Sequence, residues 1–267
     1  MNILVCVKQV PDTSEIKIDP VTNTLIRKGV PSIVNPFDSY ALEAAAQIKD
    51  KVPDTKIVAL SMGIEQAKNA LKDCLAIAAD QAYLVSDRLF GGSDTLATSY
   101  ILSNAVKKIE ELEGTFDVIF CGKQAIDGDT AQVGPELAEH LGYAQVTCAL
   151  DAEVDGSRLK VLKEDEDRNI LLGVQMPCVV TFSKSSKELR FPTVKRRIAA
   201  NHWEIKTITA ADLAEIDLTR VGLKGSPTKV KSTFVPERKS GGIFIKEDTV
   251  EASARKLCAL LANTHMI

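Results

Sequence analysis

The chain has 267 residues, of which 45% are hydrophobic, and its formal net charge is −3. This length and apolar content suit one large α/β domain, with or without extensions, and argue against a disordered chain. The slightly acidic balance argues against nucleic acid as a partner, because proteins that bind the phosphate backbone usually carry a basic excess. No apolar run approaches the roughly 18 residues of a membrane span, and the N-terminus lacks the features of a signal peptide, so we expect a cytoplasmic protein with no membrane span.

Five short apolar runs predict five strands that alternate with helices. Their continuous apolar character is typical of strands buried on both faces, as in a parallel sheet covered by helices. We therefore expect an α/β fold with a doubly wound, mostly parallel five-stranded sheet and right-handed crossovers. The predicted strands are residues 2–8, 55–63, 81–86, 116–122 and 177–183.

The segments between these strands are rich in alanine and leucine and predict helices. Asp38 is placed to cap the first helix, and Ser93 and Asp94 can cap the third. Lys107 and Lys108 suit the C-terminal turn of the third helix, where the helix dipole favours cations. The predicted helices are residues 38–51, 64–79, 94–112 and 130–142.

Two segments interrupt this alternation. Residues 15–29 alternate polar and apolar side chains around a DPVTN turn, which predicts a β-hairpin. Residues 151–175 do the same around D-G and D-R-N turns, which predicts an antiparallel appendage on one edge of the sheet.

The C-terminal part differs in composition from the rest. Residues 219–243 are rich in Gly, Pro, Ser and Lys and predict an extended arm, and residues 247–267 have apolar side chains at helical spacing. We therefore divide the chain into an α/β domain over residues 1–218 and an arm with a terminal helix over residues 219–267. Such a helix either docks on a distant surface or packs back on its own domain.

Six cysteines and three histidines carry no recognisable site pattern. The cysteines form no C-x-x-C pair and mostly lie in apolar runs, so we expect buried, reduced thiols. The histidines are scattered, and neither a metal set nor a Ser–His–Asp arrangement can be argued from them.

Ligands of an open parallel sheet bind beyond the carboxyl ends of its strands. The candidate turns are therefore residues 6–10, 61–63, 91–95 and 122–133, together with Asn35–Asp38 at the start of the first helix.

The turn at residues 122–133 is the richest of these. Free N–H groups of Thr130 to Val133 would open a helix and, with its dipole, bind an anion. Gly128 would give a ligand clearance, whereas Asp127 and Asp129 would oppose a phosphate and suit a helix cap or a ribose contact instead. No G-x-G-x-x-G or Walker lysine pattern is present. A nucleotide or diphosphate site and a capped helix without a ligand both remain open on this chemistry.

Several long motifs resemble the beta subunit of electron transfer flavoproteins. They are NILVCVKQVPDTSEIKID, VNPFDSYALEAA, ALSMG, GKQAIDGDTAQVGPELAEHLG and MPCVVTFSKSSKELRFPTVKRRIAA. The resemblance extends over nearly the whole chain. The resemblance implies a fold similar to adenine nucleotide alpha hydrolases and a heterodimer with an alpha subunit that carries one FAD. It also implies that the beta subunit binds AMP or, in electron-bifurcating members, a second FAD.

The resemblance assigns the cofactor to residues that match the family's motifs. Backbone groups near Cys6, Asn35 and Met62 would hold the adenosine, and the turn at 127–133 would hold phosphate. The full set that it implies is Cys6, Asn35, Pro36, Phe37, Asp38, Met62, Gly122, Lys123, Gln124, Ala125, Ile126, Asp127, Gly128, Asp129, Thr130, Ala131, Gln132 and Val133.

The stretch GDTAQVGP resembles the bifurcating group and favours FAD over AMP. In that case the chain would take part in electron bifurcation from NADH to an acyl-CoA dehydrogenase and to a low-potential acceptor, ferredoxin or flavodoxin. No general acid or base is then expected in this chain, because the flavin carries the chemistry. The alternatives are an ordinary electron carrier with structural AMP and a nucleotide-binding module without redox work.

Residues 184–199 match the family's recognition loop, which contacts acyl-CoA dehydrogenases. Val194 falls where an apolar anchor is expected, with Lys195, Arg196 and Arg197 as its charged rim. Glu164 falls where family members present a carboxylate to a mobile domain of the alpha subunit. The alternative for the loop is a solvated basic segment.

Overall fold

The computed structural model describes residues 1–12, 31–231 and 241–267. Contacts divide the chain into two compact units, and the described residues up to Lys231 belong to the first. The predicted hairpin at 15–29 lies outside the described residues. None of the described helices is long and apolar enough to cross a membrane.

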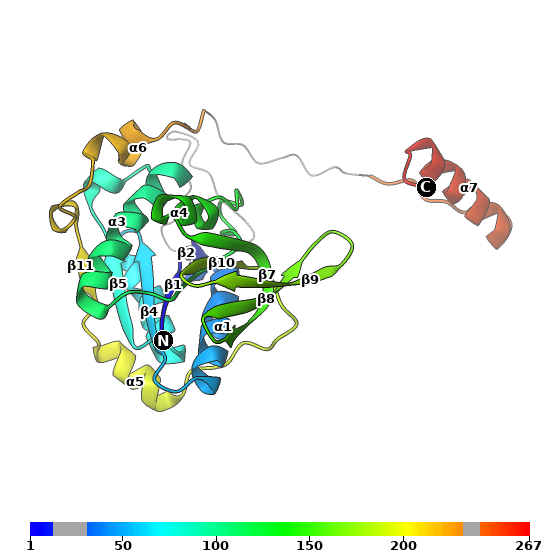
Figure 1. Cartoon of the computed structure of the whole chain (residues 1–267). Helices are drawn as coiled ribbons and strands as arrows, with labels where there is room; N and C mark the ends of the chain where they lie inside the picture. The colour runs from blue at the N-terminus through cyan, green and yellow to red at the C-terminus, as the bar shows by residue number, and fades with distance from the viewer. Residues whose placement is uncertain (13–30, 232–240) are drawn as a thin grey trace. The chain divides into compact units, whose positions relative to one another are not determined.

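The first unit is built on a nine-stranded sheet with the order β11-β5-β4-β1-β6-β10-β7-β8-β9 (Figure 1). The doubly wound α/β fold with a mostly parallel sheet is confirmed, and the five predicted strands are its parallel centre, β5-β4-β1-β6-β10. The strands are β1 (Asn2–Cys6), β4 (Lys56–Met62), β5 (Gln81–Val85), β6 (Val118–Gly122), β7 (Ala144–Asp155), β8 (Arg158–Glu164), β9 (Asn169–Gln175), β10 (Cys178–Phe182) and β11 (Lys206–Ile208).

The sheet is wider than the five strands predicted. β11 extends it in parallel beside β5, and the first residues of β7 pair in parallel with β10. The far half of β7 then pairs antiparallel with β8, which pairs with β9, so the predicted antiparallel appendage at 151–175 is confirmed. The short strands β11 and the start of β7 carry mixed polar and apolar residues, and therefore give no apolar run to recognise.

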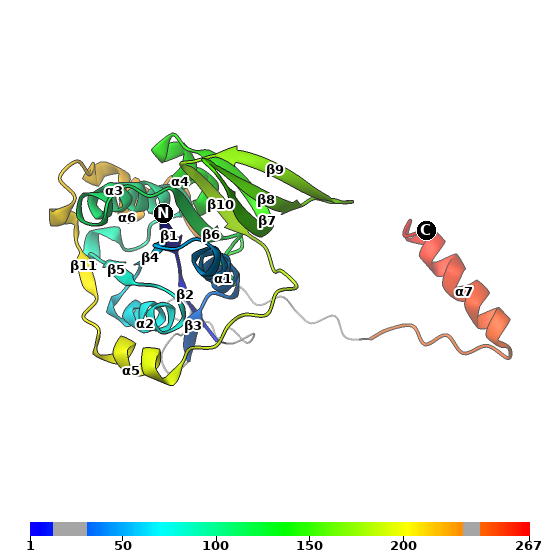
Figure 2. The same ribbon diagram turned by 60° about the horizontal axis from the view of Figure 1, so that its bottom comes forward.

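Helices cover both faces of the sheet, as Figure 2 shows. One core layer joins β1, β4 and β6 to helices α1 and α2, and the other joins the opposite faces of these strands to α3 and α4. The alternate residues Ile3 and Leu4 belong to different layers, because successive side chains of a strand point to opposite faces. The helices are α1 (Pro36–Lys51), α2 (Lys68–Ile77), α3 (Thr95–Glu113) and α4 (Val133–Leu141).

The helix starts differ from prediction in two places. Asn35 is the N-cap residue of α1, and Asp38 does not cap it, because its carboxylate is used across the sheet. Helix α4 begins at Val133 rather than at residue 130, since positive φ at Ala131 interrupts the helical path. The predicted cap of α3 is confirmed, since Asp94 Oδ1 accepts the N–H of Ala97 at 3.0 Å.

Residues 184–231 run along the surface of the first unit and contain α5 (Val194–His202) and α6 (Gly222–Gly225). Residues 219–231 do not belong to an extended arm, because Ser226 and Thr228 form hydrogen bonds with Asp94 at the start of α3. Ser226 Oγ accepts the N–H of Asp94 at 2.8 Å, and Thr228 donates its N–H to Asp94 Oδ2 at 2.9 Å. The compact unit therefore continues past residue 218 to Lys231.

The second unit contains the predicted terminal helix. Helix α7 (Val250–Asn263) begins after Thr249, whose hydroxyl accepts the N–H of Ala252 at 3.1 Å. Lys256 also pairs with Glu247 at 2.6 Å, which joins the helix to the residues before it.

We predict that Gly222→Ala destabilises the first unit. Gly222 has a φ of +63°, and a Cβ at this position would collide with the carbonyl oxygen of Leu89. Strain of about 1–3 kcal/mol should lower the midpoint of thermal unfolding by several degrees. The matched control is Gly173→Ala in β9, where a Cβ would meet nothing within 4 Å. Equal midpoints for the two variants would contradict the prediction.

Candidate functional site

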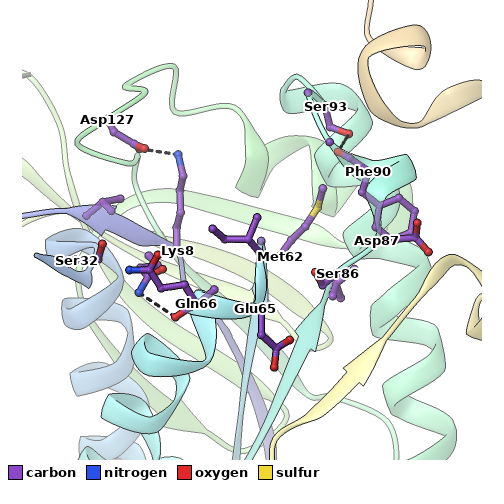
Figure 3. Close-up of a pocket in the computed structure, with 18 of the residues that line it drawn as sticks. Lys8, Ser32, Met62, Glu65, Gln66, Ser86, Asp87, Phe90, Ser93 and Asp127 are labelled. Carbon is purple, nitrogen blue, oxygen red and sulfur yellow. Dashed lines mark hydrogen bonds and ion pairs between the residues drawn. The ribbon is translucent and has the colours of Figure 1, made fainter. Parts of the chain in front are cut away.

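A cavity of about 580 Å³ opens at the carboxyl ends of β1, β4 and β5, which are neighbours in the sheet (Figure 3). Its position is the one at which open parallel sheets bind ligands, and its volume falls among small-molecule sites of about 300–1,000 Å³. It is lined by Lys8, Gln9, Val10, Pro11, Ser32, Met62, Gly63, Ile64, Glu65, Gln66, Ala67, Val85, Ser86, Asp87, Arg88, Phe90, Gly91, Gly92, Ser93 and Asp127.

The buried carboxylate of Asp38 joins the carboxyl ends of two strands, β1 and β6, beside this cavity. Its Oδ2 accepts the N–H of Lys8, just beyond β1, at 2.7 Å, and its Oδ1 accepts the N–H of Gly122, at the end of β6, at 3.0 Å. A Cβ on Gly122 would collide with the same carboxylate, so only glycine fits there. Burial raises the pKa of Asp38 to about 7, although its hydrogen bonds oppose the shift.

Asn35 holds the turn that follows β6. Its Nδ2 donates to the carbonyl of Gln124 at 2.8 Å, and its Oδ1 accepts the N–H of Ile126 at 3.1 Å. Asn35 is only 1% exposed, so both bonds are shielded from water. Together with Asp38, it fixes the turn after β6 to the start of α1.

The far end of this turn presents unused backbone donors. The N–H groups from Asp129 to Val133 form no hydrogen bond with any residue that the structure describes. Ala131 has a φ of +56°, and Gln132 follows it in a right-handed helical conformation. Successive N–H groups in such alternating conformations form concave anion sites, and the start of α4 adds its dipole. The arrangement therefore suits a phosphate or another anion.

The two acids of the turn have different surroundings. Asp127 Oδ1 lies 2.6 Å from the ammonium nitrogen of Lys8, and both residues line the cavity (Figure 3). Asp129 is exposed and makes no ion pair with a described residue. Asp127 is therefore neutralised by a lysine from another strand end and does not cap α4.

Comparison with known proteins agrees with this geometry. The family described as "Electron transfer flavoprotein domain" matches residues 22–213. The chain is 53% identical over 248 residues to "Electron transfer flavoprotein subunit beta" of Megasphaera elsdenii, an alignment that covers 92% of each chain.

The chain belongs to the electron transfer flavoprotein beta-subunit family. It is also 43% identical over 267 residues to "Caffeyl-CoA reductase-Etf complex subunit CarD" of Acetobacterium woodii, which covers 100% of each chain. To "Protein FixA" of Azorhizobium caulinodans it is 43% identical over 262 residues, covering 97% of this chain and 93% of the relative. The family expected from the motifs is thus confirmed.

The structure separates the residues that the family resemblance assigns to the cofactor into four groups. Met62 and Asp127 line the cavity. Asn35, Asp38 and Gly122 to Ile126 form its support, while Pro36 and Phe37 begin α1 behind them. Cys6 is buried in the sheet, beside Cys121 of β6. Gly128 to Val133 form the adjacent turn, and contact of all these residues with a ligand stays a prediction.

Sequence reasoning missed much of the cavity wall. Ser86, Asp87, Arg88 and Phe90 line it, yet none of them lies in a predicted turn or in a family motif. The glycines at 91 and 92 were recognised as part of a turn after a strand. That turn could have indicated that the residues just before it also line a ligand site. Asp87 shapes this wall, because its two carboxylate oxygens accept the N–H groups of Leu89 and Ala210.

The predicted partner residues lie away from the cavity. Val194 is the first residue of α5 and is 78% exposed, and Phe191 before it is 91% exposed. Arg196 is not a free rim residue, since its guanidinium donates to the carbonyls of Leu75 and Ala79 at the end of α2. Arg197 pairs with Asp73 of the same helix.

The remaining partner residues are solvent-facing. Lys195 is exposed beside Val194, and Glu164 is exposed at the end of β8, where it pairs in register with Asn169. The sequence missed Ile198, which is 56% exposed one turn after Val194 on α5.

The cysteines follow the prediction only in part. Cys6, Cys74, Cys121 and Cys178 are buried and reduced, whereas Cys148 is half-buried and Cys258 is exposed. Among the described residues, no group of His, Cys, Asp and Glu side chains is arranged to hold a metal ion.

We predict that Asp38→Asn lowers the free energy of unfolding by about 1–3 kcal/mol, because asparagine has one side-chain acceptor for two buried N–H donors. The loss should depend on pH. The pKa of this carboxyl rises from 3.8 in the unfolded chain to about 7 in the folded protein. Its contribution to stability is therefore complete below the unfolded pKa and is lost as the pH rises through the folded pKa. Urea unfolding between about pH 5 and pH 8 should therefore show the wild type's advantage shrinking with pH, and a constant difference would contradict the assignment.

Proposed function

We propose that this chain is the nucleotide-binding beta subunit of a heterodimeric electron transfer flavoprotein, and that it binds FAD at the cavity beyond β1, β4 and β5. With an alpha subunit it would mediate flavin-based electron bifurcation from NADH to an acyl-CoA dehydrogenase and to ferredoxin or flavodoxin. The alternative is an ordinary electron carrier of the same family that holds AMP in this place.

The observation that carries the proposal is the set of unused N–H groups from Asp129 to Val133. These donors stand at the start of a helix, beside a cavity large enough for a nucleotide. A non-glycine residue with positive φ, Ala131, shapes their arrangement. Strained backbone of this kind is common where a ligand is bound, and a phosphate would supply the acceptors that the protein lacks.

Two features favour FAD over AMP. The cavity continues from Asp127 along Met62–Ala67, Ser86–Arg88 and Phe90–Ser93, which offers room beyond an adenosine monophosphate. A side chain at Gly128 would meet nothing within 4 Å, so the turn is open where a diphosphate would extend. A separate observation concerns the partner: the relative CarD is named as part of a caffeyl-CoA reductase–Etf complex, which supports a CoA-thioester oxidoreductase as partner.

Bound FAD would supply hydride and single-electron transfer, and this chain would contribute binding and orientation. Backbone N–H groups of the 129–133 turn would hold the phosphates. Asn35 and Asp38 would keep that turn in place, and the walls formed by Met62 and Phe90 would exclude water from part of the cavity.

The test is identification of the nucleotides released from the purified complex of this chain with its alpha subunit. We expect two FAD per heterodimer and no AMP. One FAD with one AMP would overturn the assignment of FAD and support the ordinary carrier. Absence of any nucleotide beyond the FAD of the alpha subunit would contradict the site itself.

Two variants at Ala131 sharpen this measurement. Ala131→Val should lose the nucleotide of this chain, since a β-branched residue disfavours positive φ. Ala131→Gly is the matched control and should retain it, because glycine adopts this conformation freely. Loss from the alpha subunit as well would count against the assignment.

We further propose that the exposed apolar residues at the start of α5 anchor the dehydrogenase. Val194 and Phe191 project from a segment that is well tied down, since Arg190 forms ion pairs with Glu43 at 2.9 Å and with Asp50 at 2.7 Å. Anchored apolar side chains with charged neighbours are typical of interface hot spots.

Val194→Asp should therefore reduce electron transfer to the dehydrogenase by at least about tenfold, because a charge would replace the apolar contact. Flavin content should stay unchanged. The matched control is Leu112→Asp. Leu112 lies on α3, outside the segment that contains α5, and is 53% exposed. Unchanged transfer in Val194→Asp, or equal loss in both variants, would refute this interface.

A further inference from the structure

The ion pair between Lys8 and Asp127 forms part of the cavity wall. Lys8 leaves the end of β1 with its backbone N–H bonded to Asp38, and its ammonium reaches the turn after β6, where the Nζ–Oδ1 distance is 2.6 Å (Figure 3). The Asp127 side chain is only 9% exposed, whereas that of Lys8 is 48% exposed. Asp127 is thus the shielded partner, and Lys8 is the partner that solvent or a ligand can reach.

The other acids that line the cavity have partners of their own. Glu65 pairs with Lys68 at 2.6 Å, and the carboxylate of Asp87 accepts two backbone N–H groups. Among the described residues, Lys8 is the cation that pairs with Asp127. Without Lys8, a nearly buried negative charge would stand two residues before the N–H groups that begin at Asp129.

Such a charge would act against an anionic ligand. Coulomb repulsion between like charges is strong where the surroundings exclude water, and weak when an opposite charge lies in contact with one of them. The N–H groups of the turn attract a phosphate, whereas an unpaired Asp127 would repel it. The Lys8 ammonium decides which of these two effects prevails.

We propose that Lys8 is a specificity-determining residue, which neutralises Asp127 and thereby admits phosphate-bearing ligands to the turn at 129–133. The inference rests on the proposed nucleotide site and assigns a role to one residue of it. Lys8 acts through Asp127, and its effect should therefore scale with the charge of the ligand rather than with the adenosine part.

The test measures the affinity of the full-length chain for adenosine and for AMP by titration calorimetry. Lys8→Met should weaken AMP binding by about tenfold while changing adenosine binding less than about twofold. Asp127→Asn should bind AMP more tightly than the wild type. The double variant should return AMP binding to within about threefold of the wild type, because both charges have then been removed.

The outcomes separate this inference from the proposed function. Equal loss of adenosine and AMP in Lys8→Met would overturn it, since the lysine would then act on the shape of the site. A double variant as weak as Lys8→Met would also overturn it, because Lys8 would then act on the ligand without Asp127. If the wild type binds neither adenosine nor AMP, the proposed nucleotide site fails, and the role of Lys8 fails with it.

Discussion

The buried carboxylate of Asp38 is the interaction on which the candidate site depends. It accepts the N–H groups of Lys8, just beyond β1, and of Gly122, the last residue of the neighbouring strand β6 at the centre of the sheet. One side chain of α1 therefore holds together the two chain segments that leave the sheet toward the cavity. Buried backbone donors need such partners, and here the requirement places the start of both turns.

The rest of the turn after β6 follows from this anchor. Asn35 bonds both to the carbonyl of Gln124 and to the N–H of Ile126, so the first half of the turn is rigid and satisfied. The second half differs, because its N–H groups have no described partner and Ala131 holds positive φ. A rigid support beneath unsatisfied donors is an arrangement that is organised before a ligand arrives, which lowers the entropy lost on binding.

Charge explains why a turn that we propose to bind phosphate can contain two aspartates. Asp127 is compensated by Lys8, and Asp129 is exposed to solvent, where its field is screened. The same principle applies to α5, where Arg196 and Arg197 are occupied by carbonyls and a carboxylate of α2. In both places a charged residue serves the local fold, and the surface left for a ligand or partner is less charged than the sequence suggests.

The sequence by itself determined the elements whose signals are local. The five central strands, the cap of α3 by Asp94 and the antiparallel appendage were predictable, because apolar runs, capping residues and turn dipeptides act within a few residues. The family was predictable from the resemblance of its long motifs. Beyond that, most of the site was decided by tertiary structure. Asp38 looked like a helix cap, yet its partners lie 30 and 84 residues away. The Lys8–Asp127 pair spans 119 residues, and the wall residues Ser86–Arg88 and Phe90 carry no motif. Hydrogen bonds and ion pairs of this kind depend on which strands become neighbours, and that order is set by the packing of the whole sheet rather than by any local pattern.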